Sequence, residues 1–433
     1  MNPTNVKAIL EKALKNAQAD DVVAILHGGN VASTRMADNL ITQNVQRDTA
    51  TLYVECAFGQ QHGSASTDDL SDESLKNTVE RAQSIAKASP ADEEYMPPVP
   101  AAETEKHPKV DRYCETTANT TPEDKARALA GAADEAKKLE MRLSGGYRTG
   151  AHFLAVANSA GLNAYHTHTD AELHATALGE KGSGWAEQVS ESVTNVDVQA
   201  TASRALAIGR AAQDPKPIEP GKYDVILSPA AIGELLLSTM WWGMDAKATD
   251  EGRTFLREKL GTQLLGKNIT LRSDPTDARC PGGPFQSNGL VAPTLPWVEK
   301  GVVKNLFYSR FWAKKQGKPA TGRATNFLME GGDTSVKDMI ASIERGLLVN
   351  RFWYIRHVDP MVPLLTGMTR DGLFLIEDGQ IVHPVRQMRF NENTVDMLNR
   401  VETLGPVERT AGPPMLMPTI KVKQFNFDSE TKF

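Results

Sequence analysis

Three polar residues, His166, His168 and Asp170, have the types and the spacing that could hold a metal ion. They alternate along a segment, 162–177, whose pattern predicts a β-strand, so their side chains share one face. An H-x-H-x-D triplet can begin a zinc site, which needs three protein ligands. Most such strand faces are solvated or hydrogen-bonded, and no fourth ligand stands out. We therefore favour an ordinary polar face over a metal site.

Other catalytic signatures are weaker. Residues 261–268 resemble a phosphate loop, but Asn268 offers no hydroxyl for Mg²⁺, and the segment follows a predicted helix instead of a strand. The glycine-rich segment 179–184 lacks the order of a dinucleotide site and is interpreted as a loop. No G-x-S-x-G elbow is present. All nine histidines lie outside residues 175–356, so local imidazoles cannot serve the element described next.

Residues 221–261 predict a strand that leads into a helix. Tyr223–Leu227 is an apolar run, Ser228 is a suitable N-cap, and Pro229 suits the first helical turn. Four apolar residues then recur at helical spacing, which predicts a half-buried helix. Trp241–Trp242 lies at its end, and we favour packing over a binding platform for this pair.

The rest of the chain predicts an α+β protein with two domains, an N-terminal α+β domain over 1–213 and a C-terminal β-rich domain over 221–433. The segment DPKPIEP between them has three prolines and no periodicity, which is typical of a domain boundary. The second domain is expected to be mainly antiparallel, with hairpin turns near 299–301 and 378–379. Its further helices are expected at 251–260 and 335–346.

The first domain is expected to repeat one plan, helix, strands and helix, on either side of a proline-rich connection at 90–108. In the first round the expected elements are a helix at 5–19, strands at 21–27 and 51–56, and a helix capped by Ser71. In the second round they are a helix starting at Thr121–Pro122, strands at 141–148, 152–157 and 162–177, and a helix at 196–212.

Composition excludes several classes of function. The 433 residues are 40% hydrophobic and 24% charged with a net charge of −6, which argues against a nucleic-acid footprint. No apolar run is long enough to span a membrane, and the amphipathic N-terminus does not resemble a signal peptide. Three cysteines without paired spacing fit a reducing compartment. We therefore expect a cytoplasmic protein.

Several segments, in their order along the chain, resemble the TldD/PmbA family, whose PmbA members are also called TldE and which was long labelled a modulator of DNA gyrase. The matching pieces include GKYDVILSPAAIGELL, GRTFLREKLGTQLLGKNITLRSDP, VEKGVVKNLFYSRFWAKKQGKPATGRATN and TGMTRDGLFLIEDGQIVHPVRQMRFNENTVDML. In the first half, GSASTDDLSDESLKNTVERAQSIAKASPAD and ANSAGLNAYHTHTDAEL also resemble the family pattern. The resemblance covers nearly the whole chain.

The resemblance implies where a metal site would lie. The family's catalytic member carries His-Glu-x-x-x-His on the helix after the first strand of its second domain, with a C-terminal cysteine completing a zinc site. Placed on this sequence, Gly233 and Ser238 occupy the histidine positions and Glu234 the glutamate position. Residues 409–413, where the cysteine is expected, read RTAGP. The resemblance therefore implies a PmbA/TldE-like chain with no catalytic, cofactor or metal-binding residues of its own, and with zinc only in a partner subunit.

The family also implies partners and a function. We expect a dimer with a zinc-bearing TldD-like paralogue, in which the complex captures an extended peptide by strand addition and matures or degrades it. We expect no direct nucleic-acid or membrane partner, and the lone chain is expected to be inactive.

Two alternatives stay open. One is a homodimeric peptide-binding or regulatory protein of the gyrase-modulator type. The other is an independent hydrolase with a non-standard metal site that gathers His166, His168, His357 or His383.

Overall fold

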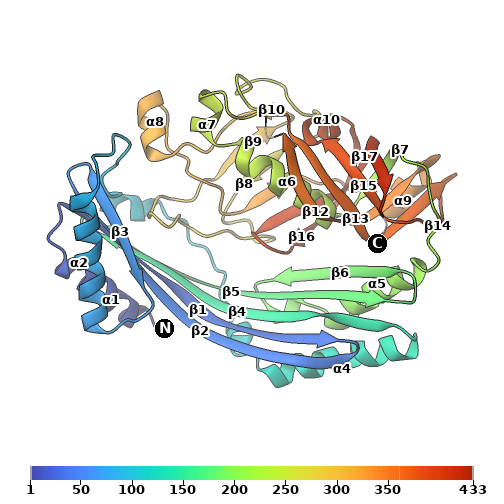
Figure 1. The fold of residues 1–433 in the computed structure, drawn as a ribbon, viewed down its shortest axis with the longest axis horizontal. Helices are drawn as coiled ribbons and strands as arrows, with labels where there is room; N and C mark the ends of the chain where they lie inside the picture. The colour runs from blue at the N-terminus through green and yellow to red at the C-terminus, as the bar shows by residue number, and fades with distance from the viewer. Residues whose placement is uncertain (1, 360, 432–433) are drawn as a thin grey trace.

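The N-terminal half of the chain forms one antiparallel sheet (Figure 1). The structure is a computed structural model that describes residues 2–359 and 361–431. Six strands follow the order β3-β2-β1-β4-β5-β6. They are β1 (Asp21–Ala37), β2 (Leu40–Phe58), β3 (Gln61–Thr67), β4 (Arg142–Asn158), β5 (Asn163–Leu178) and β6 (Ser183–Ser190).

Four helices cover one face of this sheet, α1 (Pro3–Asn16), α2 (Asp72–Ala88), α4 (Pro122–Lys138) and α5 (Val198–Ala211). Two apolar clusters lie between the helices and the sheet, one under α1 and α2 and the other under α4 and α5. The expected repeat of helix, strands and helix is confirmed, since each round supplies three adjacent strands and two helices.

Local chemistry sets the starts of these helices. The Ser71 hydroxyl accepts a hydrogen bond from the backbone N–H of Ser74 at 3.3 Å. Thr121 and Asp124 form a reciprocal capping box at the start of α4. Each cap satisfies backbone N–H groups that the helix leaves without partners.

The strands differ most from expectation in their length. β1 and β2 pair from Asp21↔Ala57 to Ala37↔Leu40, through residues 28–50 that carry no clear alternation. Strand β6 was not expected, because its glycine-rich start at 179–184 was interpreted wholly as a loop. Gly184 lies inside β6, where it lets α5 approach closely: a Cβ there would lie 2.1 Å from the Gly209 nitrogen.

The C-terminal half is built around an eleven-stranded mixed sheet. Five of its strands, in the pairing order β7-β12-β13-β15-β17, form a closed circuit because β17 also pairs with β7. Only the β12–β7 and β11–β17 pairings are parallel among the described strands, so the expected antiparallel character is confirmed. The strands are β7 (Gly221–Leu227), β8 (Leu271–Ser273), β9 (Leu295–Glu299), β10 (Val302–Val303), β11 (Phe327–Met329), β12 (Arg345–Asp359), β13 (Leu364–Glu377), β14 (Gln380–Pro384), β15 (Met388–Asn393), β16 (Val401–Thr410) and β17 (Met415–Glu430).

The helices of this half are α6 (Pro229–Gly243), α7 (Ala246–Asp250), α8 (Arg310–Gln316), α9 (Val336–Ala341) and α10 (Thr394–Asn399). The predicted helix at 251–260 is wrong: Gly252 takes a left-handed φ of 73° and the segment forms turns. The helix predicted at 335–346 ends early, at Ala341, and Gly346 lies in β12. Both predicted hairpins are present, as β9–β10 and β13–β14.

Between α2 and α4 the chain forms a short 3₁₀ turn, η1 (Ala101–Lys106), and the four-residue α3 (Glu115–Ala118); another 3₁₀ turn, η2 (Val193–Asn195), precedes α5. No helix among residues 2–359 and 361–431 is long and apolar enough to cross a membrane. The uncovered face of the N-terminal sheet turns toward the C-terminal half (Figure 1), and strand β6 contacts β13 and β16 of that half.

Candidate functional site

Helix α6 is fixed at its start by strand β12. The Ser228 N–H donates to the carbonyl of Val349 at 3.2 Å, and the Ser228 hydroxyl bonds the carbonyl of Asn350. The same hydroxyl accepts from the N–H of Ala231 at 3.2 Å, as the predicted N-cap requires. The strand-to-helix element predicted from 221–261 therefore exists and begins where expected.

Gly233 lies buried beneath the β16–β17 turn. A Cβ at this position would lie 3.3 Å from Thr410 Oγ1 and 3.5 Å from Met417 Cγ. A larger side chain would have to displace one of these neighbours, because Met417 is fully buried and Thr410 nearly so. The two places where the family resemblance implies missing ligands, α6 and residues 409–413, therefore touch each other in space.

Glu234 is half-buried on α6, beside the carboxylate of Glu187 from β6. Burial raises the pKa of Glu234 to about 7, the charge of Arg351 opposes this, and the charge of Glu187 adds to it. Burial likewise raises the pKa of Glu187 to about 7, although its carboxylate accepts the Ala411 N–H at 3.1 Å. Two carboxyl groups from the two halves of the chain therefore share one weakly solvated region.

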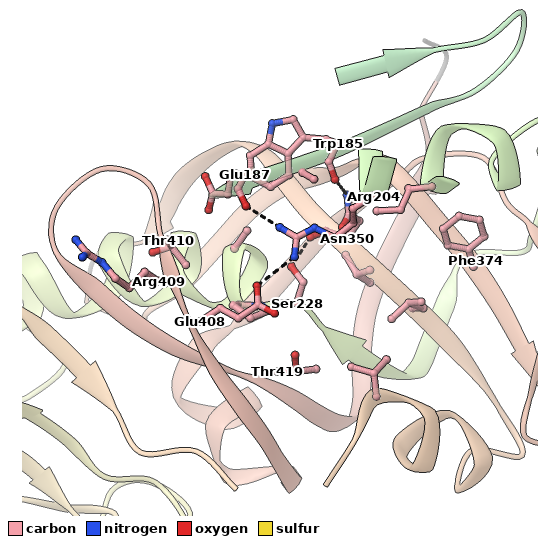
Figure 2. Close-up of a pocket in the computed structure, with 17 residues that line it drawn as sticks. Trp185, Glu187, Arg204, Ser228, Asn350, Phe374, Glu408, Arg409, Thr410 and Thr419 are labelled. Atoms are coloured by element: carbon pink, nitrogen blue, oxygen red, sulfur yellow. Dashed lines mark hydrogen bonds and ion pairs between the residues drawn. The ribbon is translucent and has the colours of Figure 1, made fainter. Parts of the chain in front are cut away.

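A cavity of about 260 Å³ lies next to these carboxylates (Figure 2). The guanidinium of Arg204, from α5, crosses it: one N–H donates to the Glu187 carbonyl at 2.6 Å, and the group pairs with Glu408 at 3.4 Å. The cavity is lined by residues of both halves, among them Trp185, Glu187, Ser228, Ala230, Asn350 and Thr410.

Ser238, the second degenerate position, lies one turn beyond Glu234 on the same half-exposed side of α6. Trp241 follows on this side, partly buried, and its ring meets Phe307 edge-on with centroids 6.2 Å apart. Trp242 is 68% exposed, so the interpretation of the pair as packing holds for only one of them.

The side chains around α6 lack the ligand types of the zinc site that the family resemblance implies. Glycine, serine and threonine stand where nitrogen and sulfur ligands would be needed, and burial raises the pKa of the one remaining carboxyl, on Glu234, to about 7. Residues 2–359 and 361–431 contain no group of three or more His, Cys, Asp or Glu side chains placed to hold a metal ion. The donor set at α6 does not fit zinc.

On the histidine face of β5, Asp170 and His168 contact His152 of β4, whereas the buried Nε2 of His166 has no hydrogen-bond partner among the described residues. Asp170 bonds His152 at 2.6 Å, and His152 stacks on His168 with ring centroids 4.9 Å apart. Burial lowers the pKa of His168 to about 3 and that of His166 to about 4, helped by the charge of Arg112. His357 and His383 lie far along the chain on β12 and β14.

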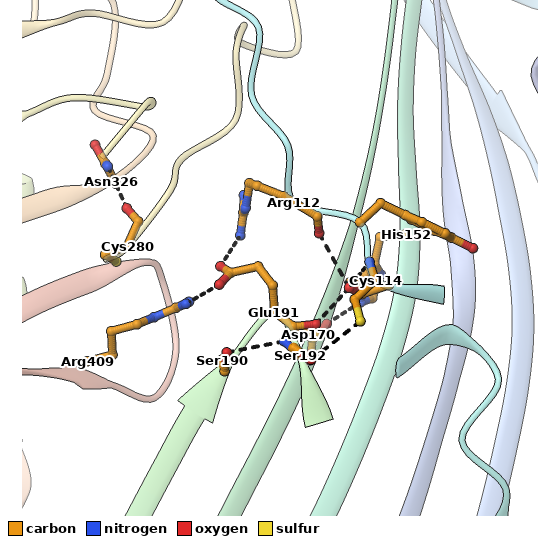
Figure 3. Close-up of polar contacts among 12 residues, drawn as sticks. Arg112, Cys114, His152, Asp170, Ser190, Glu191, Ser192, Cys280, Asn326 and Arg409 are labelled. Carbon is orange, nitrogen blue, oxygen red and sulfur yellow. Dashed lines mark hydrogen bonds and ion pairs between the residues drawn. The ribbon is translucent and has the colours of Figure 1, made fainter. Parts of the chain in front are cut away.

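Glu191, at the end of β6, joins the two halves (Figure 3). It pairs with Arg112 of the N-terminal half at 3.7 Å and with Arg409 of β16. Neither Glu191 nor Glu187 was singled out from the sequence, because the strand that carries them was not recognised. A period-two pattern in the segment SGWAEQVS is the feature of the sequence from which strand β6 could have been predicted.

Comparisons with known proteins agree with this architecture. The model for the PmbA/TldA metallopeptidase C-terminal domain matches residues 220–429, and the model for PmbA/TldA metallopeptidase domain 1 matches residues 22–86. The fold is therefore that of a metallopeptidase-class protein. Because the two models together cover more than half of the residues, the chain belongs to the PmbA/TldD family, as the resemblance predicted.

Its relatives include the Escherichia coli O157:H7 metalloprotease PmbA, 22% identical over 92% of this chain and 90% of that protein. A Haemophilus influenzae PmbA homologue is 25% identical over 92% and 89%. The crystal structure of TldE from Thermococcus kodakarensis superposes with a TM-score of 0.89 at 19% identity, covering 98% of this chain and 100% of that one. Two archaeal relatives, from Methanocaldococcus jannaschii and Methanothermobacter thermautotrophicus, align over only 53% and 46% of their length.

Proposed function

We propose that this chain is the zinc-free, PmbA/TldE-like subunit of a TldD/PmbA-type metallopeptidase. It dimerises with a zinc-bearing paralogue in the cytoplasm, and the complex captures extended, unfolded or leader peptides and matures or degrades them. The chain contributes capture and closure of the peptide site, and the partner contributes the metal and the hydrolytic chemistry.

One observation carries the proposal. Gly233 is packed against Thr410, so the helix position and the C-terminal position that would hold zinc ligands in a catalytic relative meet here without a histidine or cysteine. Neither a glycine nor a threonine can replace these ligands. One side of the helix is nevertheless packed into the main apolar core of the C-terminal half, which supports a structural role in assembly.

The peptide role is supported by unpaired strand edges near this helix. Among the described strands, β6 pairs only with β5 and β16 only with β17. On the free side of β6 the carbonyls of Trp185 and Glu187 already accept from side chains, and on β16 that of Gly405 accepts from the Gly332 N–H, so an added strand would pair with the remaining edge groups. An extended peptide can satisfy such groups by adding a strand, which reads the backbone more than the side chains.

The test is reconstitution. The chain is purified alone, mixed with a zinc-bearing TldD-type paralogue, and assayed for complex formation by light scattering and for cleavage of an unfolded peptide. We expect no cleavage by the lone chain, and a heterodimer that cleaves only while zinc is bound.

A matched control replaces the glutamate of the paralogue's His-Glu-x-x-x-His helix by glutamine, which should abolish cleavage without preventing assembly. The corresponding change in this chain, Glu234→Gln, should leave cleavage within about twofold, since Glu234 faces no metal. Zinc-dependent cleavage by the lone chain would overturn the proposal.

A further inference from the structure

A second and larger cavity lies at the other end of the interface between the halves. Its volume is about 850 Å³, within the range of ligand sites. Strands β1 and β2 and the proline-rich connection form one wall, and residues 286–290 and the start of α8 form the other. Its apolar lining includes Val23, Ile25, Met96, Val99, Phe307 and Phe311.

Two arginines line this cavity, Arg310 and Arg323. Among residues 2–359 and 361–431, no carboxylate oxygen lies within 4.0 Å of either guanidinium. Arg310 donates one N–H to the carbonyl of Pro97 at 2.6 Å, and burial lowers its pKa, so its charge is poorly solvated. Its remaining N–H groups are available to an anion.

Arg323 is exposed, but two aromatic rings and a backbone hydrogen bond orient it. Its guanidinium lies over the ring of Trp241, 5.2 Å from the centroid, and 5.9 Å from that of Phe307. Its backbone N–H donates to Gln286 Oε1 at 3.0 Å, and Gly322 before it has a left-handed φ of 61°. A guanidinium stacked on its face keeps its in-plane N–H fork for a carboxylate.

The acids of the cavity are already engaged. Glu94 pairs with Lys247, and Glu55 lies 3.6 Å from a ring nitrogen of His62. Asp245 caps α7 by accepting the N–H of Ala248 at 2.9 Å. Glu103, whose charge reaches Arg310, pairs with Lys106 at 2.8 Å. Lys247 balances the charge of Glu94, while Glu55 and Asp245 are held by His62 and by a backbone N–H. Among the described residues, Arg310 and Arg323 have no carboxylate within 4.0 Å, so each guanidinium can still pair with an added carboxylate.

We infer that this cavity binds the free C-terminal carboxylate of a peptide that ends in an apolar residue. A C-terminal residue carries its carboxylate and its side chain on the same Cα. The arginines of the cavity can therefore bind the carboxylate while the apolar lining contacts the side chain. The inference rests on the proposed role in peptide capture, and it adds which end of the peptide this chain holds.

The test uses three N-terminally fluorescein-labelled heptapeptides, with binding followed by anisotropy to the full chain and to its complex with the zinc-bearing paralogue. The first peptide ends in leucine with a free carboxylate, and the second is its amide. The third is the amide with glutamate at the penultimate position. We expect the free acid to bind at least about tenfold more tightly than either amide.

Arg323→Gln should remove this preference while leaving amide binding unchanged, and Arg310→Lys should retain part of it because the charge remains. Arg389→Gln is the matched control. Arg389 is an exposed arginine on β15 that, among the described residues, likewise has no carboxylate within 4.0 Å, and it does not line the cavity. Thermal melts of each variant report folding.

Equal binding of acid and amide would overturn the inference and leave the proposed function standing. Binding of the glutamate amide as tightly as the free acid would also overturn it, since an acidic side chain would then be the ligand. Absence of binding by all three peptides, together with no cleavage by the complex, would instead overturn the proposed function.

Discussion

At the scale of single residues, the burial of Glu234 makes the stability of the protein depend on pH. The family resemblance predicts that Glu234 takes the glutamate position of a metal-site helix, and the charges that act on it come from Arg351 and Glu187. Burial raises its pKa from 4.5 to about 7. The folded chain therefore binds more protons than the unfolded chain between these two values, so stability falls as the pH rises through that window.

Glu234→Gln removes this charge. We expect the free energy of unfolding to rise by about 1–3 kcal/mol at pH 8 and to stay unchanged near pH 4. Urea unfolding at the two pH values measures the difference. Glu105→Gln, an exposed glutamate on η1, is the control and should change neither value. An equal gain at both pH values would contradict the assigned cause.

At the scale of elements, the packing of α5 on β6 decides how β6 is presented to the C-terminal half. Gly184 and Gly209 face each other across this contact. A Cβ on Gly184 would lie 2.1 Å from the Gly209 nitrogen and 2.3 Å from the Ala205 carbonyl oxygen. These are backbone atoms, which cannot rotate away, so the helix itself would have to move.

Gly184→Ala should therefore lower the free energy of unfolding by about 1–3 kcal/mol. Gly131→Ala is the matched control on α4, where the added Cβ meets only the side chain of Gln199. That change should be neutral or stabilising by up to about 1 kcal/mol, because alanine favours a helix over glycine. Chemical denaturation of the two variants tests the contrast, and equal losses would refute it.

At the scale of the whole molecule, polar contacts fasten β6 to the C-terminal half. Asn350 donates to the carbonyls of Trp185 at 2.9 Å and Asp371 at 2.8 Å. Ser183 bonds the Asp371 carboxylate at 2.6 Å. The expected domain boundary at 214–220 lies outside helices and strands, so the two halves are connected there by an accessible segment.

Asn350→Ala should loosen this junction and expose the 214–220 segment, speeding its limited proteolysis by about tenfold. Asn399→Ala is the matched control, because Asn399 also donates to two carbonyls, of Leu264 and Val395, but within one half. Mass spectrometry of the fragments locates the cut. Equal cleavage rates for the two variants would show that Asn350 does not hold the halves together.

The sequence by itself determined what depends on neighbours along the chain. Ser71, Thr121 and Ser228 cap their helices as predicted, since a cap needs only residues three positions away. Alternation over 51–56 identified six of the 19 residues of β2, and the order of short motifs identified the family. The absence of histidines near Gly233 could likewise be read directly.

Only the tertiary structure decided what depends on residues far apart. The glycine-rich segment near residue 184 resembles a loop in the sequence. These glycines instead allow the close approach of α5, and a contact with residues so far along the chain produces no local sequence pattern. Residues 28–50 pair over their whole length, although they show no alternation, because their register is set by the flanking strands. The contact of Gly233 with Thr410, the proximity of Glu187 to Glu234, and the placement of Arg310 and Arg323 in the lining of one cavity each bring together segments from different elements. Such contacts are fixed by packing and burial, which no local pattern encodes.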